Sequence, residues 1–142
     1  MRFWDSSALV PLLVAEPVTP AVRELYLKDH AVAVWWATPV ECASAIARLE
    51  RDRALAAKEA AESYRRLDAL VPSWIEIEPA AEIREIARRL LRAYPIRTGD
   101  SLQLAAAYLA AERRPPTLDL VTLDDRLADA ADREGFVVVR PA

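Results

Sequence analysis

The stretch Ala31-Val-Ala-Val-Trp-Trp-Ala-Thr-Pro-Val-Glu41 joins two different patterns. Residues 31–36 form a continuous apolar run of strand length, which is typical of a strand covered on both faces. A helix start follows at once, with Thr38 as N-cap, Pro39 at the first helical position and Glu41 at the third, the pattern of a capping box. A buried strand that leads directly into a helix is typical of α/β folds.

The same alternation of strand and helix patterns extends along the chain in both directions. We expect strands at residues 2–4, 31–36, 118–122 and 136–139, and residues 74–77 alternate as either a further strand or an extended connection. We expect helices at 8–15, 20–29, 56–70 and 79–94, and three more that open at Thr38, Thr98 and Asp124. Because right-handed crossovers place every strand-to-helix turn at one edge, this order predicts an α/β fold with a mostly parallel sheet and helices on both faces.

Composition limits the kinds of chemistry that the chain can perform. The 142 residues are 54% apolar and 29% charged, with a net charge of −3, as expected of one compact soluble domain. The two glycines, Gly99 and Gly135, are too few for a glycine-rich phosphate loop. One histidine (His30) and one cysteine (Cys42) exclude disulfides and Cys/His zinc cages, and argue against Ser-His-Asp or Cys-His catalysis. We interpret both of these residues as structural.

The sequence carries no membrane or export signal. Its N-terminus lacks a basic stretch followed by an apolar run and a cleavage site, and no segment approaches eighteen uninterrupted apolar residues. We therefore expect a cytoplasmic protein that does not enter the membrane.

Acidic residues follow several of the expected strands. Asp5 leaves the first strand, Glu41 follows the second, and Asp124 follows the strand at 118–122, so the topology places these three acids at one edge of the sheet. Asp100, at a helix start, is a fourth candidate. Each acid also has a purely structural interpretation as a helix cap or first-turn carboxylate. Carboxylates that converge on one crevice repel one another, and Mg²⁺ or Mn²⁺ relieves that repulsion through oxygen ligands.

Four motifs in order resemble the PIN-domain family, and more narrowly the VapC-type ribonuclease toxins of bacterial and archaeal toxin–antitoxin pairs. They are Asp5-Ser-Ser-Ala-Leu9, Thr38-Pro-Val-Glu-Cys-Ala-Ser-Ala-Ile-Ala-Arg48, Gly99-Asp-Ser-Leu-Gln-Leu-Ala-Ala-Ala107 and Val121-Thr-Leu-Asp-Asp-Arg-Leu-Ala128, followed by Gly135. The resemblance spans nearly the whole chain, and the ordered set is much more specific than any one motif. It departs from the family at Pro11, which stands where many relatives carry a lysine.

The resemblance implies a single PIN-like domain over residues 1–142, a three-layer α/β/α sandwich that cleaves RNA endonucleolytically with Mg²⁺ or Mn²⁺. Asp5 and Asp100 match the direct metal ligands best, and Glu41 and Asp124 would complete the site as ligands or by holding waters. The resemblance also implies a small antitoxin partner and a homodimer.

Two further positions near the acids stay open. The Thr-x-Asp spacing from Thr122 favours Asp124 over its neighbour Asp125. Ser7 matches a hydroxyl often found near the metal in the family, and it is an equally good helix-start residue.

Tryptophans and arginines supply weaker candidates for RNA contacts. Trp35 and Trp36 are adjacent in the expected buried strand, so we expect them to point to opposite covered faces and pack in the core rather than stack on bases. The arginines after Glu41 either meet phosphates or belong to a solvated helix face; they are Arg48, Arg51 and Arg53.

Two rival functions belong to other classes. A catalytically silent PIN-like binding module would use the acidic crevice to receive a partner's arginine, although such a module has no reason to keep the complete acid set. An aspartate-based phosphatase would need a second aspartate two residues past Asp5, where Ser7 stands, or a lysine at a later strand end, which the sequence does not offer.

Overall fold

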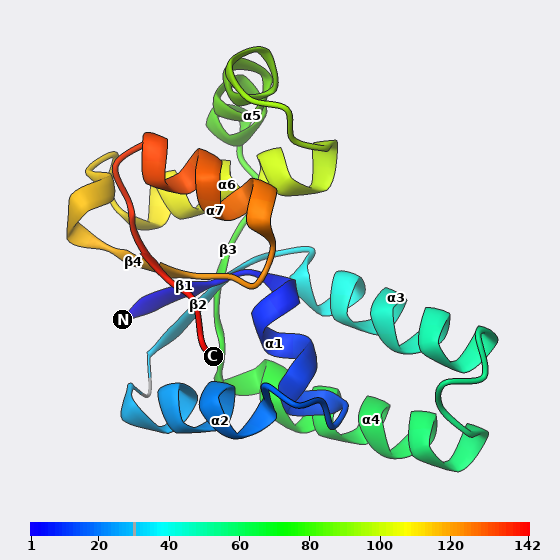
Figure 1. Cartoon of the computed structure of the whole chain (residues 1–142). Coiled ribbons are helices and arrows are strands. Elements are labelled where there is room, and N and C mark those ends of the chain that lie inside the picture. Colours follow the sequence, from blue (N-terminus) through cyan, green and yellow to red (C-terminus); the bar gives the residue numbers. More distant parts are fainter. Residues whose placement is uncertain (30) are drawn as a thin grey trace.

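A computed structural model of the chain describes residues 1–29 and 31–142 (Figure 1). The strands are β1 (Arg2–Trp4), β2 (Val32–Trp35), β3 (Ile75–Ile77), β4 (Asp119–Val121) and β5 (Val137–Val139). The α-helices are α1 (Ser6–Leu13), α2 (Thr19–Lys28), α3 (Thr38–Arg51), α4 (Ala57–Leu70), α5 (Ala81–Ala93), α6 (Thr98–Ala110) and α7 (Asp125–Arg133). Two short 3₁₀ turns, Val71–Ser73 and Pro115–Thr117, precede β3 and β4.

The five strands form one sheet in the order β3-β2-β1-β4-β5, and every neighbouring pair is parallel. Arg2 of the central strand β1 pairs with Val32 on one side and with Asp119 on the other. The chain adds strands on one side of β1 up to β3 and then crosses to the other side for β4. The strand order thus reverses between β1 and β4, the kind of place where open α/β sheets form ligand crevices.

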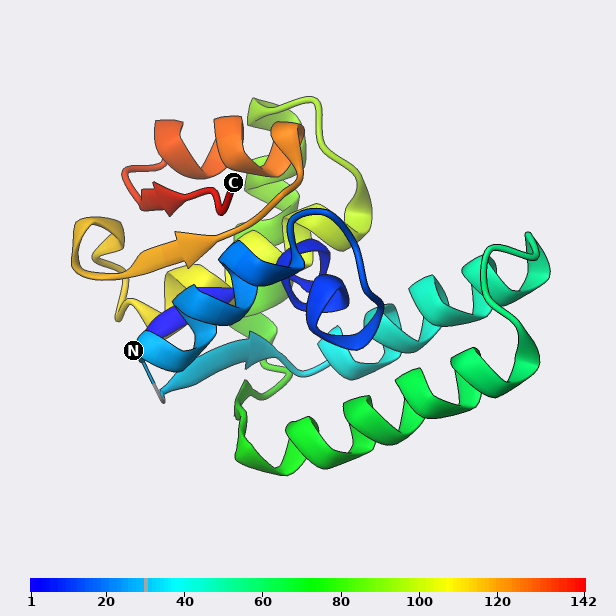
Figure 2. The same ribbon diagram turned by 60° about the horizontal axis from the view of Figure 1, so that its bottom comes forward.

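Helices cover both faces of the sheet. Figure 1 shows α5, α6 and α7 above the strands and α1, α2 and α4 below them. The antiparallel pair of α3 and α4 projects beyond the sheet, as the turned view in Figure 2 also shows. The predicted three-layer α/β/α sandwich is therefore confirmed, and its sheet is parallel throughout.

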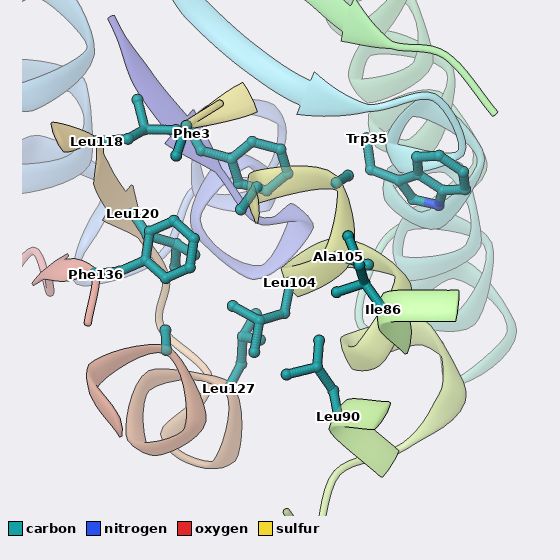
Figure 3. Packing of buried hydrophobic residues seen from close by; sticks show 14 of the residues in the cluster. Phe3, Trp35, Ile86, Leu90, Leu104, Ala105, Leu118, Leu120, Leu127 and Phe136 are labelled. Carbon is teal, nitrogen blue, oxygen red and sulfur yellow. The ribbon is translucent and has the colours of Figure 1, made fainter. Parts of the chain in front are cut away.

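Alternation along the strands divides the core into two clusters, one under each helical layer. Phe3 packs under α5, α6 and α7, whereas its neighbour Trp4 packs against α1 and α3. Figure 3 shows the first cluster, in which Trp35 lies near Ile86 of α5. Because successive strand side chains point to opposite faces, strands this short need apolar residues at nearly every position.

Two helix starts differ from the prediction, one in its first residue and the other in its N-cap. The helix expected at 8–15 begins at Ser6, because the Asp5 carboxylate accepts a hydrogen bond from the backbone N–H of Ser7 and caps it. The predicted capping box at Thr38 is wrong. Ala37 is the N-cap, without a side-chain hydrogen bond, and the side chains of Thr38 and Glu41 are bound to another helix instead.

The prediction that Trp36 packs in the core is also wrong, because 50% of its surface is exposed while Trp35 is buried. Strand β2 ends at Trp35, so the alternation that buries the strand does not extend to the next residue. His30 lies outside the described residues. Within the described residues, no helix is both long enough and apolar enough to span a membrane.

Candidate active site

Each of the four predicted acids lies where a strand gives way to a helix or where a helix begins. Asp5 directly follows β1 and is the N-cap of α1, and Asp124 follows β4 and is the N-cap of α7. Glu41 and Asp100 lie in the first turns of α3 and α6. The parallel sheet places the ends of β1, β2 and β4 at the same edge, where α6 also begins.

Asp5 is almost completely buried, with 4% of its surface exposed. Its Oδ2 accepts hydrogen bonds from the hydroxyls of Ser7 at 2.5 Å and Thr122 at 2.9 Å. Burial raises the pKa of the Asp5 carboxyl, and the hydrogen bonds from Ser7 and Thr122 oppose that shift. The buried charge therefore depends on hydroxyl donors from two separate segments of the chain.

The same two hydroxyls join the turn after β1 to the turn after β4. The backbone N–H of Leu123 donates to Oγ of Ser7 at 2.9 Å, and that of Asp124 donates to Oγ1 of Thr122 at 3.0 Å. Oδ1 of Asp124 in turn accepts from the N–H of Leu127 at 2.9 Å and so caps α7. This network fixes Asp124 relative to Asp5. Asp5 and Asp124 can therefore each cap a helix and still belong to the acidic site.

Glu41 is held by side chains from α1 and α6. Its Oε1 accepts from Nε2 of Gln103 at 3.0 Å, and its Oε2 accepts from the Ser6 hydroxyl at 3.3 Å. Gln103 is buried and also donates to the Thr38 hydroxyl at 3.1 Å. Burial, followed by the charge of Asp5, raises the pKa of Glu41 to about 7.

Asp100 is partly buried, and its Oδ2 accepts from the backbone N–H of Arg97 at 3.3 Å. Burial raises the pKa of Asp100. The Arg97 N–H opposes the shift, and the nearby charge of Asp124 adds to it. Asp100 also raises the pKa values of Asp5 and Glu41. Asp5, Glu41 and Asp100 are thus each close enough to another acid of the site for its charge to raise their pKa.

A cavity of about 490 Å³ brings three of the four predicted acids together. Asp5 is buried and does not line this cavity, but the hydroxyls of Ser6 and Ser7, which do line it, contact the Asp5 carboxylate. The lining residues are Ser6, Ser7, Val10, Glu16, Glu41, Ser44, Ala45, Arg48, Arg97, Asp100 and Asp124. A second cavity, of about 390 Å³, is lined by Arg97, Asp100, Asp124, Asp125 and Arg126.

The donor chemistry of the site fits a hard divalent cation. Carboxylate and hydroxyl oxygens are the ligands that Mg²⁺ and Mn²⁺ prefer. In the part of the chain that the structure describes, no group of three or more Asp, Glu, His or Cys side chains is placed to hold a metal ion. Because Mg²⁺ commonly uses one or two carboxylates and fills its other positions with water, a pair of these acids is a sufficient protein contribution.

Several residues of the site were not singled out for a role from the sequence. Ser6 and Gln103 hold Glu41, Thr122 holds Asp5, and Arg97 lines both cavities. Gln103 carries a recognisable signal, because it is a polar residue within the otherwise apolar buried run of α6. Ser6 and Thr122 lie within the motifs quoted above but were given no role of their own, and Arg97 lies outside these motifs.

The remaining candidates divide between the site and the rest of the molecule. Arg48 lines the acidic cavity, whereas Arg51 and Arg53 are exposed near the end of α3, away from its lining. Asp125 is exposed and forms an ion pair with Arg140. Cys42 is buried, which raises the pKa of its thiol to about 12, so the thiol is protonated and not a nucleophile.

Comparison with known proteins identifies the family. The family model described as PIN domain matches residues 2–133. The chain belongs to the PIN-domain family. This PIN domain is 33% identical over 144 residues to Ribonuclease VapC35 of Mycobacterium tuberculosis, covering 99% of this chain and 97% of the relative. It is 34% identical over 142 residues to Ribonuclease VapC46 of the same organism, with the same coverage.

Solved structures share the fold at lower sequence identity. A toxin–antitoxin complex from Klebsiella pneumoniae contains a chain with a TM-score of 0.69 and 17% identity to this PIN domain, covering 100% of this chain and 98% of that one. At this identity the likeness concerns the fold alone. It agrees with the parallel sheet and the two helical layers described above.

Proposed function

We propose that this PIN domain, as one unit over residues 1–142, is a metal-dependent endoribonuclease and the toxin of a toxin–antitoxin pair. The observation that carries the proposal is the meeting of Asp5, Glu41, Asp100 and Asp124, from four separate segments, at one edge of the sheet. Isolated helix caps need no such convergence, and three of these acids have raised pKa values because they are buried beside one another. Relatives of similar length that are named ribonucleases give further support.

In this proposal Asp5 and Asp100 hold Mg²⁺ or Mn²⁺, and Glu41 and Asp124 complete the site. The bound ion would supply Lewis-acid activation of water and stabilise negative charge on the scissile phosphate. Ser7 and Thr122 occupy Oδ2 of Asp5, so Oδ1, which has only a 3.4 Å contact from the Ser6 hydroxyl, is the oxygen left for a ligand. Gln103 positions Glu41 by fixing its Oε1.

Arginines at the rim of the acidic cavities would hold the phosphates of the RNA. Arg48 and Arg97 line the larger cavity, and Arg97 and Arg126 line the smaller one. Guanidinium groups suit bidentate contacts with phosphate oxygens. They also offset the negative charge that four carboxylates would present to a polyanion, so a net charge of −3 is compatible with RNA binding.

The proposal includes a small antitoxin partner and a homodimeric toxin. Support for the partner comes from the toxin–antitoxin complex from Klebsiella pneumoniae, one chain of which shares this fold.

Cleavage of RNA by the purified, antitoxin-free protein tests the function. We expect endonucleolytic products from single-stranded RNA in Mn²⁺ or Mg²⁺, and none when EDTA replaces the metal, because the carboxylates alone offer no Lewis acid. Asp132→Asn, on the exposed face of α7, serves as a control that should cleave like the wild type. Equal cleavage in EDTA would contradict the metal-dependent reaction.

Thermal unfolding tests the metal site without knowledge of the RNA. A ligand present at ten times its Kd stabilises the folded state by about 1.4 kcal/mol, or roughly 5 °C in Tm for a chain of this size. We expect Mn²⁺ to raise the Tm of the wild type by this amount and to leave that of Asp5→Asn unchanged. An equal rise in both proteins would place the metal elsewhere.

A further inference from the structure

Trp36 differs from the other tryptophans of the chain in its exposure. Trp36 is 50% exposed, whereas Trp4, Trp35 and Trp74 are 1%, 6% and 6% exposed. Its position is fixed, because its backbone N–H donates to the carbonyl oxygen of Ile77 at 3.1 Å and its ring packs edge-on against that of Trp35, with 6.5 Å between ring centroids. A large aromatic ring is therefore held in place and left half uncovered.

The ring lines a cavity of about 470 Å³ beside the acidic site. The other lining residues are Trp35, Pro79, Ala80, Ala81, Ile83, Arg84 and Leu102. Two of its lining residues lie close, in the chain, to residues that hold the acidic site. Leu102 is followed on α6 by Gln103, and Gln103 binds both Thr38, two residues after Trp36, and Glu41. The Trp36 cavity and the acidic site are therefore built on the same two elements, the start of α3 and the first turns of α6.

A row of arginines leads away from the Trp36 cavity along α5. Arg84, Arg88 and Arg92 follow one another at intervals of four residues, so they lie on one face of the helix, and all three are exposed. Arg88 and Arg92 line a further cavity of about 610 Å³, together with Glu85, Arg89 and Ala93. Within the described residues, Arg84, Arg88 and Arg92 form no ion pair at 4 Å or less.

Arg89, on the same helix, differs from these three arginines because its guanidinium group has partners within the protein. It forms an ion pair with Glu134 at 2.7 Å and lies over the Tyr108 ring, with 5.7 Å between its guanidinium carbon and the ring centroid. The other three arginines of α5 have their charge available for an outside anion. Helix α5 also carries the exposed acids Glu82 and Glu85, so its four arginines leave it with an excess of positive charge, in a protein whose net charge is −3.

We propose that Trp36 and Arg84 form a base-binding subsite for single-stranded RNA, with Arg88 and Arg92 holding the phosphates that follow. This subsite rests on the proposed ribonuclease function and gives it a substrate path. An aromatic platform beside a row of cations is how sequence-tolerant proteins bind single strands, since every base has a face that can stack. Bases in a duplex are not free to stack in this way, so the subsite selects unpaired RNA.

The charges on α5 argue against a second copy of the chain as the occupant. A two-fold interface uses the same patch of both copies, so one built on this face would bury the exposed arginines of both copies in a single interface. Like charges across an interface oppose association. A polyanion has the complementary charge.

Binding of an eight-nucleotide oligouridylate, followed by fluorescence anisotropy in EDTA so that the RNA stays intact, tests the subsite. We expect Trp36→Ala to weaken binding about tenfold and Trp36→Phe to retain most of it, because a phenyl ring still stacks. We expect Arg88→Gln to make the slope of log K against log salt shallower by about 0.7, the effect of losing one of the two proposed phosphate contacts on a single strand. Val137→Ala and Arg65→Gln, exposed residues that line neither cavity, are the matched controls.

Tryptophan fluorescence provides an independent readout, because Trp36 is the exposed member of the four. We expect iodide to quench the free protein and the oligonucleotide to protect it, and we expect both effects to disappear in Trp36→Phe. Unchanged RNA affinity in Trp36→Ala would overturn the subsite. A second pair of results would also overturn it. If iodide did not quench Trp36 in the RNA-free wild type, and Trp36→Ala changed the oligomeric state measured by light scattering, a second copy of the chain would be covering the ring.

The two proposals fail in different ways. A protein that binds the oligonucleotide through Trp36 but does not cleave RNA in Mn²⁺ would remove the nuclease function and leave the subsite in place. A protein that cleaves RNA while Trp36→Ala binds and cleaves like the wild type would remove the subsite and leave the nuclease function.

Discussion

Asp100→Asn should cleave RNA at least about 100-fold more slowly than the wild type in Mn²⁺, because in the proposed site Asp100 would be one of the two charged oxygen ligands of the ion. Asp100 lines both acidic cavities, and its charge adds to the effect of burial in raising the pKa values of Asp5 and Glu41. An asparagine oxygen can still accept from the N–H of Arg97, so we expect α6 to begin as before. Single-turnover cleavage at saturating RNA measures the effect.

Asp125→Asn is the matched control for this loss and decides between the two adjacent aspartates after β4. Asp124 lines both cavities, whereas Asp125 lines only the smaller one and pairs with Arg140 on the surface. We expect Asp125→Asn to cleave within about threefold of the wild type and Asp124→Asn to lose activity like Asp100→Asn. A wild-type rate in Asp100→Asn, with unchanged circular dichroism and Tm, would refute the assigned site.

The fold was predictable because strand order and sheet geometry leave few choices. Short apolar runs separated by amphipathic helices require a covered parallel sheet, and right-handed crossovers place the ends of its strands together. Asp5 and Asp124 could therefore be placed at one edge from their positions after two strands. Asp100 follows no strand directly, and its place beside them depends on how α6 crosses the sheet, which the spacing alone does not fix.

The local errors have a common physical cause. Thr38 and Glu41 match a capping box, but Gln103 of α6 binds both side chains, so a contact from a residue more than sixty positions away overrides the local pattern. Trp36 continues the apolar run of β2, yet it lies one residue beyond the strand and faces a cavity. The periodicity of a segment does not reveal that Gln103 contacts Thr38 and Glu41, or that Trp36 faces a cavity.

The hydroxyl network around Asp5 could not be derived from the sequence for a related reason. Ser7 and Thr122 are separated by 115 positions, and their contact at 3.2 Å exists only because β1 and β4 are adjacent strands. Serine and threonine near helix starts are common as caps, so their residue types alone do not mark them. The sequence motifs identify the acids. The fold determines which neutral hydroxyl groups donate hydrogen bonds to a buried carboxylate and so stabilise its charge.

The metal-free protein should lose stability as the pH rises, and Glu41 should account for a measurable part of the loss. Its pKa is about 7 in the folded protein and 4.5 in its ordinary state. Between these values the folded state binds more protons than the unfolded state, so the free energy of unfolding falls as the pH increases from about 4.5 to above 7. The shift corresponds to about 2 to 3 kcal/mol after allowance for solvent screening of this partly exposed carboxylate.

Glu41→Gln should remove this part of the pH dependence, because its amide keeps an acceptor for Gln103 and cannot ionise. We expect the variant to match the wild type near pH 5 and to be more stable by about 2 kcal/mol at pH 8 in EDTA. Urea unfolding at several pH values measures both slopes, with Glu50→Gln on the same helix as the control. Parallel slopes in Glu41→Gln and the wild type would mean that Glu41 titrates normally. In that case the carboxylates are too well solvated to repel one another, and a cation would have little repulsion to relieve.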